Sequence, residues 1–298
     1  MNASWHPPTD SGMSVRHIAA RGLSFEVIEA GEGDHLALCL HGYPELAYSW
    51  RHQIPLLAEM GYRVWAPNQR GYGMTTRPEG VDFYRLEYMV CDAAALFEAS
   101  GARTLTLIGH DWGGVVGWSF AIHRVRPLDR LVVMNAPHPR SFSRAMRYWP
   151  QQRRSWYLAA YQAPELPERM LLRNEVAALR RLFLQQAGDP STFPDAVVDV
   201  FAQAAMQPGA MTAMLNWYRA APLNPRPRWL PYQATVEVPT LIIWGEEDRT
   251  LGLETLDGTE EFVPDLTVRR LPGIGHWVQQ EAPDAVNEAL RSWLPGGR

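Results

Sequence analysis

The chain has 298 residues, 46% of them hydrophobic and 20% charged, and its formal net charge is −4. This is the composition of a soluble globular protein, and the mild acidity gives no reason to expect a nucleic-acid or membrane partner. No apolar run approaches the ~18 residues of a membrane span, and residues 1–14 lack the basic start and apolar segment of a signal peptide. We therefore expect a cytoplasmic protein.

Cysteine and lysine usage narrows the possible chemistry. Cys39 and Cys91 are too few for a disulfide framework and lack the pattern of a metal site, so we expect both in the core. All 28 basic residues are arginine, which removes a Walker A lysine, a Schiff-base lysine and a pyridoxal phosphate attachment site. No Gly-x-Gly-x-x-Gly turn follows a strand. We therefore expect no metal or cofactor, and chemistry carried by side chains and water.

The first part of the chain alternates strand-like runs with helical stretches. Runs such as LSFEVIEAG and HLALCLHG end in turn residues, whereas the intervening stretches have apolar residues at helical spacing. The predicted strands are 23–31, 35–42, 62–73 with its glycine-punctuated loop, 103–110 and 130–139, and the predicted helices are 49–61, 86–101 and 113–124. This alternation predicts parallel strands with helices on both sheet faces.

The alternation stops between residues 140 and 228, where the sequence is rich in Arg, Gln and Trp and has several helical periods but no convincing strand. Strand character returns at 238–248 and at 266–276, with helices predicted near 252–261 and 283–294. We therefore predict an α/β core formed by residues 1–136 and 229–298, interrupted by a helical cap at residues 137–228.

The stretch LIGHDWGGVVG, residues 107–117, predicts a nucleophile on a tight turn between a strand and a helix. Small neighbours are needed there because the turn is strained and the helix passes close to the strand, and Gly109, Gly113 and Gly114 supply them. The central residue is Asp111, where serine is usual. A Gly-x-Asp-x-Gly string alone is a weak signal, because many turns contain Asp as a local cap. The strand before it and the helix after it strengthen the prediction.

Two further residues complete a predicted catalytic triad. Asp248 ends the apolar strand LIIWGEED, and His276 lies in the glycine-rich loop LPGIGH after another strand. Taken singly, each could be an ordinary loop or structural residue. Together with Asp111 they occupy the carboxyl ends of predicted parallel strands, where such sheets bind ligands, in the chain order nucleophile, acid, histidine.

The string HGYP, residues 41–44, follows the second predicted strand. In this arrangement one oxyanion-hole N–H comes from such a loop and the other from the residue after the nucleophile. The predicted donors are therefore the main-chain amides of Tyr43 and Trp112. The alternative is that HGYP is a simple turn after a strand.

Five strings in this order, HGYP, GHDWGG, MNAPHP, WGEEDRTL and GIGHWVQQEAP, resemble the epoxide hydrolases of the α/β-hydrolase superfamily. The resemblance extends from about residue 21 to residue 295. It implies the α/β-hydrolase fold, a mostly parallel doubly wound sheet with an inserted helical cap. It also implies two cap tyrosines that point into the pocket.

The cap strings RSWYLAAYQAPELPE and LNWYRA match those of the family and carry the tyrosine role to Tyr157 and Tyr218. Tyr161 lies one helical turn from Tyr157 and is an alternative to it. Asn68 stands where the family often has Asp, and we expect this difference to alter loop packing alone. The expected pocket is apolar and aromatic, and its other predicted lining residues are His41, Pro44, Trp156 and Trp217.

An aspartate nucleophile suits attack at an sp³ carbon, because the product is an ordinary alkyl ester that water activated by His276 can hydrolyse. Asp248 would hold the tautomer of His276. A halide leaves as a stable anion, whereas an epoxide oxygen needs a general acid, and two cap tyrosines would provide one. The sequence thus predicts hydrolysis of a small apolar or aromatic epoxide by water.

Three alternatives remain. A haloalkane dehalogenase shares Asp-Trp-Gly at the elbow but typically has Asn where this chain has Tyr43. A fluoroacetate dehalogenase would need arginines just after the nucleophile, and DWGGVVG contains none. A ligand receptor built on the same fold would have slow or no turnover, which a complete triad argues against. The particular epoxide and the oligomeric state are not encoded in a recognisable way.

Overall fold

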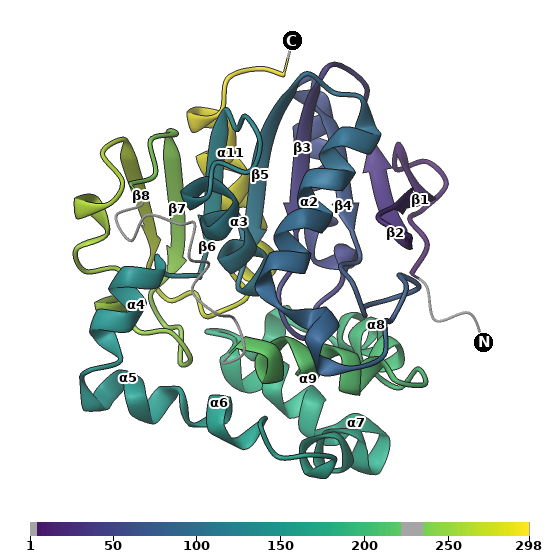
Figure 1. The fold of residues 1–298 in the computed structure, drawn as a ribbon, viewed down its shortest axis with the longest axis vertical. Coiled ribbons are helices and arrows are strands. Elements are labelled where there is room, and N and C mark those ends of the chain that lie inside the picture. The colour runs from purple at the N-terminus through teal and green to yellow at the C-terminus, as the bar shows by residue number, and fades with distance from the viewer. Residues whose placement is uncertain (1–4, 222–234, 298) are drawn as a thin grey trace.

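The computed structural model describes residues 5–221 and 235–297. An eight-stranded sheet runs through the centre of the molecule in the order β1-β2-β4-β3-β5-β6-β7-β8 (Figure 1). Its strands are β1 (Met13–Ala20), β2 (Leu23–Ala30), β3 (His35–Leu40), β4 (Arg63–Pro67), β5 (Thr104–His110), β6 (Arg130–Met134), β7 (Thr240–Gly245) and β8 (Leu266–Leu271). β1, β2 and β4 pair antiparallel, and every other pair is parallel. The predicted mostly parallel sheet is confirmed.

Helices cover both faces of the sheet, as the alternation of strands and helices predicts. α2 (Leu86–Ser100) and α3 (Trp112–Ile122) lie on one face, and α1 (Gln53–Glu59) and α11 (Pro283–Trp293) lie on the other (Figure 1). Each face has its own cluster of buried apolar side chains. β3 and β5 contribute to both clusters because successive side chains of a strand point to opposite faces. Burial on both faces explains why these strands are apolar throughout.

Three details differ from the sequence-based predictions. β1 was not predicted; it pairs with β2 at the sheet edge, and Ile18 alone of its residues is buried. The predicted helix near 252–261 is wrong: this stretch forms two short 3₁₀ turns, Leu253–Thr255 and Thr259–Glu261, separated by Gly258 at φ 74°. Gly258 ends any helical run because this left-handed conformation breaks the hydrogen-bond ladder. Cys91 is exposed on α2 rather than in the core, whereas Cys39 is buried.

Among its described residues, the segment that interrupts the core forms helices joined by turns and no strand. It contains α4 (Pro139–Ala145), α5 (Trp149–Arg154), α6 (Trp156–Ala160), α7 (Leu166–Gln186), α8 (Asp195–Ala205) and α9 (Ala210–Ala220). These helices lie together beneath one edge of the sheet (Figure 1). The predicted end of the cap, residue 228, lies outside the described residues. Within the described part of the chain, no helix has the length and apolar character that crossing a membrane requires.

Candidate active site

Asp111 occupies a strained turn between β5 and α3. Its φ of 49° and ψ of −119° lie outside the regions that ordinary side chains favour. The glycines around it leave no room for larger residues. A Cβ on Gly113 would lie 2.0 Å from the carbonyl oxygen of Leu40, and one on Gly109 would lie 2.3 Å from that of Gly113. The turn thus holds the Asp111 carboxylate forward of the sheet, which is the arrangement of a nucleophile elbow.

The structure brings the three predicted triad residues together. Nδ1 of His276 lies 2.7 Å from Oδ2 of Asp248, and its Nε2 lies 3.7 Å from Oδ2 of Asp111. Asp248 is held in turn by the side-chain amide of Asn135, which donates to Oδ2 at 2.7 Å. The main-chain amides of Thr250 and Leu251 donate to the other oxygen. Asn135 belongs to the string MNAPHP, but its role was not predicted.

Burial and neighbouring charge act against each other on these groups. Burial alone would lower the pKa of His276, but Asp248, Asp111 and Glu45 raise it to about 9. Burial raises the pKa of Asp111, although His276 partly opposes this shift. For Asp248 burial is outweighed by the charge and hydrogen bond of His276, so its pKa is lowered. His276 is therefore protonated near neutral pH while both carboxylates flank it.

The two predicted oxyanion donors face Asp111. The amide of Tyr43 donates to Oδ1 of Asp111 at 2.8 Å, and a hydrogen bond from the Trp112 amide lowers the pKa of the same carboxyl. A Cβ on Gly42 would lie 2.5 Å from the Cβ of Asp111, so this loop can approach the nucleophile because residue 42 is glycine. These donors are placed to stabilise negative charge on an oxygen bonded to Cγ of Asp111.

A buried carboxylate that was not predicted anchors this loop. Oε2 of Glu45 accepts from the amide of Gly42 at 3.0 Å and lies 2.7 Å from Nδ1 of His110. Oε1 accepts from the side-chain amides of Gln279 and Gln280. The other ring nitrogen of His110 lies 2.8 Å from the carbonyl oxygen of His276. Glu45 directly follows HGYP, and His110 directly precedes Asp111. Their positions next to predicted motifs are the sequence feature that could have pointed to them.

A cavity of about 750 Å³ lies between the core and the cap and contains the Asp111 carboxylate. Tyr157 and Tyr218 both line it, as does Tyr161. Burial, followed by the charge of Asp111, raises the pKa of Tyr157 and of Tyr218 well above the ordinary value. Both phenols are therefore protonated near neutral pH and can act as hydrogen-bond donors.

The three cap tyrosines are not equivalent in position. The ring centroid of Tyr161 lies 5.1 Å from that of Tyr218 and 5.7 Å from that of Tyr43. Burial raises the pKa of both Tyr157 and Tyr161. The charges of Asp111 and Asp248 add to the rise for Tyr157, whereas for Tyr161 the neighbouring Tyr43 opposes the rise and Asp111 adds to it.

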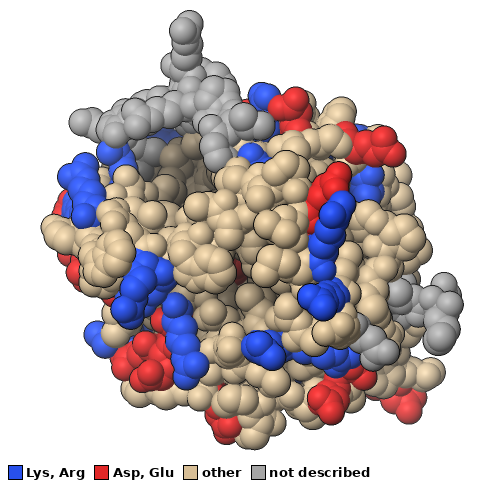
Figure 2. All heavy atoms as spheres, turned by 90° about the horizontal axis from the view of Figure 1, so that it is seen from below, with Lys and Arg blue, Asp and Glu red and all other residues tan. Residues whose placement is uncertain are grey.

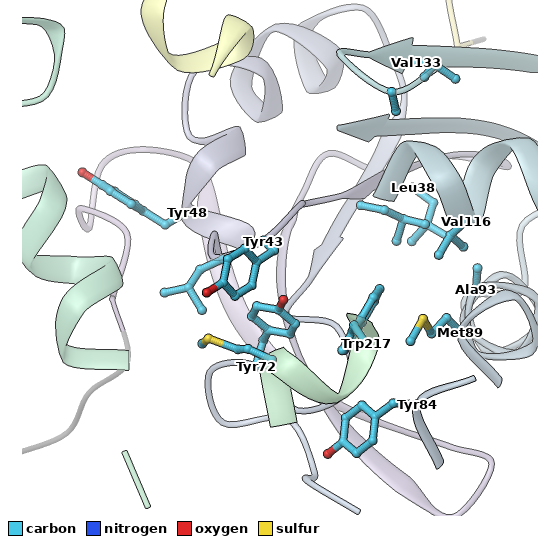
Figure 3. Packing of buried hydrophobic residues seen from close by; sticks show 14 of the residues in the cluster. Leu38, Tyr43, Tyr48, Tyr72, Tyr84, Met89, Ala93, Val116, Val133 and Trp217 are labelled. Carbon is cyan, nitrogen blue, oxygen red and sulfur yellow. The ribbon is translucent and has the colours of Figure 1, made fainter. Parts of the chain in front are cut away.

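Three of the four predicted pocket residues do not line the cavity. Trp217 is buried, donates from Nε1 to the carbonyl of Arg70, and packs between Tyr72 and Met89 (Figure 3). The sequence could not reveal this because Trp217 and Tyr218 are adjacent in α9 and point to different sides of the helix.

His41 and Pro44 are the other two. His41 is buried behind the loop, where Nε2 accepts from the amide of Gln69. Pro44 follows a cis peptide bond within the loop and shapes it without reaching the cavity. Trp156 does line the cavity, but it is 69% exposed and therefore lies at its edge.

Asn68 has a packing role. Its Oδ1 accepts from the amide of Ala47 at 2.7 Å, and its Nδ2 donates to the buried carboxylate of Glu26. An aspartate here would place two carboxylates together, whereas the amide satisfies Glu26 as a donor. Asn68 does not line the cavity.

Comparison with known proteins agrees with this geometry. Residues 38–283 match the protein family described as "alpha/beta hydrolase fold". The chain is 36% identical over 285 residues to the AB hydrolase superfamily protein YfhM of Bacillus subtilis, covering 95% of this chain and 98% of that protein. It is 35% identical over 288 residues to Epoxide hydrolase 4 of Mus musculus, covering 92% of this chain and 77% of that protein.

Solved structures give the same result. The crystal structure of a Bacillus megaterium epoxide hydrolase in complex with an inhibitor superposes with a TM-score of 0.84 at 30% sequence identity. The match covers 93% of this chain and 99% of that one. The agreement in sequence and in fold extends along nearly the whole chain. The protein therefore belongs to the epoxide hydrolases of the α/β-hydrolase superfamily.

Proposed function

We propose that this enzyme opens epoxides to vicinal diols through a covalent alkyl ester on Asp111. The observation that carries the proposal is that the two carboxylate oxygens of Asp111 have different neighbours. Oδ1 accepts from the Tyr43 amide, while Oδ2 faces Nε2 of His276 and the cavity. A carboxylate held in this way has one oxygen free to attack and one already placed against the donors that hydrolysis of its ester requires.

In the first step, Oδ2 of Asp111 attacks a ring carbon and the bond between that carbon and the ring oxygen breaks. The ring oxygen takes a proton from Tyr157 or Tyr218, because an alkoxide is too basic to leave unprotonated. The products are the Asp111 ester, a hydroxyl group on the neighbouring carbon and a tyrosinate. The imidazolium of His276 then supplies the proton that restores the tyrosine.

In the second step, neutral His276 removes a proton from water, and the resulting hydroxide attacks Cγ of Asp111. The oxyanion forms on Oδ1, where the amides of Tyr43 and Trp112 stabilise it. When the tetrahedral intermediate collapses, the bond between Cγ and the former Oδ2 breaks. That oxygen, bonded to the substrate carbon, takes the proton from His276 and leaves as part of the diol. The new carboxylic acid of Asp111 then ionises and His276 is protonated again, so the cycle closes.

The ester also explains how His276 can act as a base despite its raised pKa. The negative charge of Asp111 is one of the causes that raise this pKa to about 9. Esterification removes that charge, so the pKa of His276 falls at the stage when the neutral form is needed. Asp248 remains and holds Nδ1 at 2.7 Å, which keeps Nε2 directed toward the ester.

The cavity favours an epoxide over a haloalkane. Tyr43 contributes its amide to the nucleophile at the position where a dehalogenase typically has a halide-binding Asn. The phenols of Tyr218, which is buried, and Tyr157, which is partly buried, line the cavity with Asp111, and proton donors are what an epoxide oxygen requires and a halide does not. Small apolar or aromatic epoxides suit the aromatic lining.

Trapping the ester tests the proposal. A His276→Gln variant should consume about one equivalent of styrene oxide and then stop, because alkylation needs no base whereas hydrolysis does. Intact mass should increase by one substrate, and digestion should locate the addition on the peptide that contains Asp111. An Asp111→Ala variant is the control and should form neither adduct nor diol. Diol formation by the wild type with no adduct in the His276→Gln variant would contradict the covalent route, and absence of diol from a panel of aryl and aliphatic epoxides would contradict the activity.

A further inference from the structure

The cavity has chemically different ends. Apolar residues line the part between α6 and the start of α7, among them Leu166, Met170 and Leu171. At the other end, the lining is polar and basic and consists of Arg153, Arg154, Gln185, Gln186, Arg249 and Thr250. Figure 2 views the molecule from the cap side, where a mostly uncharged central surface is bordered by charged side chains.

Hydrogen bonds fix this basic end in place. The side-chain amide of Gln151 on α5 donates to the carbonyl of Thr250 at 2.9 Å and accepts from the amide of Gly252 at 3.1 Å. The hydroxyl of Thr250 donates to Gln186 at the end of α7 at 2.7 Å. These contacts join α5, α7 and the loop after Asp248, so the arginines of α5 and of this loop border one end of the cavity.

Among the described side chains, an acid balances Arg154 alone of the three arginines at this end. Arg154 pairs with Glu254, but neither Arg153 nor Arg249 has an acidic partner among the described side chains. Among the described lining residues Asp111 is the single acidic one, and its Oδ2 lies 3.7 Å from Nε2 of His276, whose pKa is raised to about 9. The described lining residues therefore carry a positive excess at the end away from the apolar part.

We infer that the preferred substrates are epoxides with an apolar chain on one ring carbon and a carboxylate close to the other. This inference rests on the proposed function. The apolar chain would lie along Leu166, Met170 and Leu171, and the carboxylate would lie between Arg153 and Arg249. Guanidinium groups bind carboxylates in bidentate geometry, and a positive cavity mouth also raises the encounter rate of an anion. Without these arginines the charge of Asp111 would repel such a substrate.

The test compares trans-2,3-epoxyoctanoate with its neutral analogue trans-2,3-epoxyoctanamide. The wild type should have a higher kcat/KM for the acid, and added salt should reduce the difference. Arg153→Gln and Arg249→Gln should each lower kcat/KM for the acid about 3- to 5-fold through KM, because both side chains are partly in solvent. Both substitutions should lower kcat/KM for the amide less than for the acid, because the amide carries no charge. Arg147→Gln is the matched control, because Arg147 is exposed on the cap and does not line the cavity.

A binding measurement separates this inference from the proposed function. Calorimetric titration with octanoate and octanamide needs no turnover. Octanoate should bind more tightly than octanamide, and the Arg153→Gln and Arg249→Gln variants should lose this preference while Arg147→Gln keeps it. Equal effects of all three substitutions, or no preference for the acid in the wild type, would overturn the anion site. If the enzyme opens the epoxide ring of trans-2,3-epoxyoctanamide but not that of trans-2,3-epoxyoctanoate, the proposed epoxide hydrolase activity is supported and the inferred anion site is rejected.

Discussion

The main-chain amide of Tyr43 donates a 2.8 Å hydrogen bond to Oδ1 of Asp111, the residue proposed to attack the substrate. The proposed oxyanion donor thus contacts the carboxylate of the proposed nucleophile directly. The same donor can remain on Oδ1 as the carboxylate becomes an ester and then a tetrahedral intermediate, so no rearrangement is needed when charge develops. The arrangement is suited to attack of water on Cγ of Asp111.

This relationship predicts the fate of solvent oxygen. In a single turnover in heavy-oxygen water, the label should enter the carboxylate of Asp111, because solvent hydroxide adds to Cγ and the former Oδ2 of Asp111 leaves in the diol. Mass spectrometry of the peptide that contains Asp111 measures it. A first-turnover diol that carries all of the label would mean that water attacks the epoxide directly.

The cap tyrosines should share the role of general acid. Tyr157→Phe and Tyr218→Phe should each slow epoxide opening moderately, because one hydroxyl can partly replace the other. The double variant should lose about 10²- to 10⁴-fold, the usual range for general acid catalysis. Rates of ester formation in a stopped-flow experiment measure this step.

Tyr161→Phe provides the comparison within the same cavity. Its ring contacts those of Tyr157 and Tyr218. Besides burial, Tyr43 and Asp111 act on its pKa, whereas both Asp111 and Asp248 act on the pKa of Tyr157. We expect a much smaller effect on ester formation than in the double variant. A larger effect for Tyr161→Phe than for Tyr157→Phe would move the role of proton donor to Tyr161.

Lower pH should cause the alkyl ester to accumulate. The pKa of His276 is raised to about 9 in the free enzyme and falls once Asp111 is esterified, since Asp111 contributes to the increase. The neutral imidazole is the base, so hydrolysis of the ester slows as pH falls through the pKa of the ester form, while alkylation needs no base. Acid quenching during steady-state turnover and intact mass spectrometry measure the ester fraction. A fraction that is constant between about pH 5 and about pH 9 would contradict this role of His276.

Glu45 should be important for stability although it does not contact the cavity. Its carboxylate is completely buried and holds the 41–45 loop, His110 and the side chains of Gln279 and Gln280. In Glu45→Gln the new side-chain NH₂ group would face N–H groups that now donate to the carboxylate, and a buried charge would be lost. We therefore expect a loss of about 2–4 kcal/mol in the free energy of unfolding. Urea denaturation measures it.

An exposed carboxylate serves as the control for that experiment. Glu98 pairs with Arg126 at the surface, and both side chains are about half exposed. Glu98→Gln should cost less than about 1 kcal/mol because such pairs are screened by solvent. Equal losses in the two variants would show that the network around Glu45 contributes no more than a surface pair.

The sequence determined the sheet, the elbow and the triad because these are set by local patterns. Buried strands need continuous apolar runs, and the turn at Asp111 needs glycines whose Cβ atoms would collide with the chain. Chain order then placed Asp248 and His276 at neighbouring strand ends. The edge strand β1 was missed because its apolar signal is weak: Met13 and Val15 pack on one face, Ile18 and Ala20 pack on the other, and Ile18 alone is buried.

The tertiary structure decided which side chains reach the cavity. Trp217 and Tyr218 are adjacent in sequence, yet one packs into the core and the other lines the cavity, because helical residues one apart point in different directions. Arg153, on α5, and Arg249, after β7, lie far apart in the chain and border the same end of the cavity. Their proximity depends on how the cap docks on the core, which hydrogen bonds such as Gln151 to Thr250 fix and no local pattern encodes.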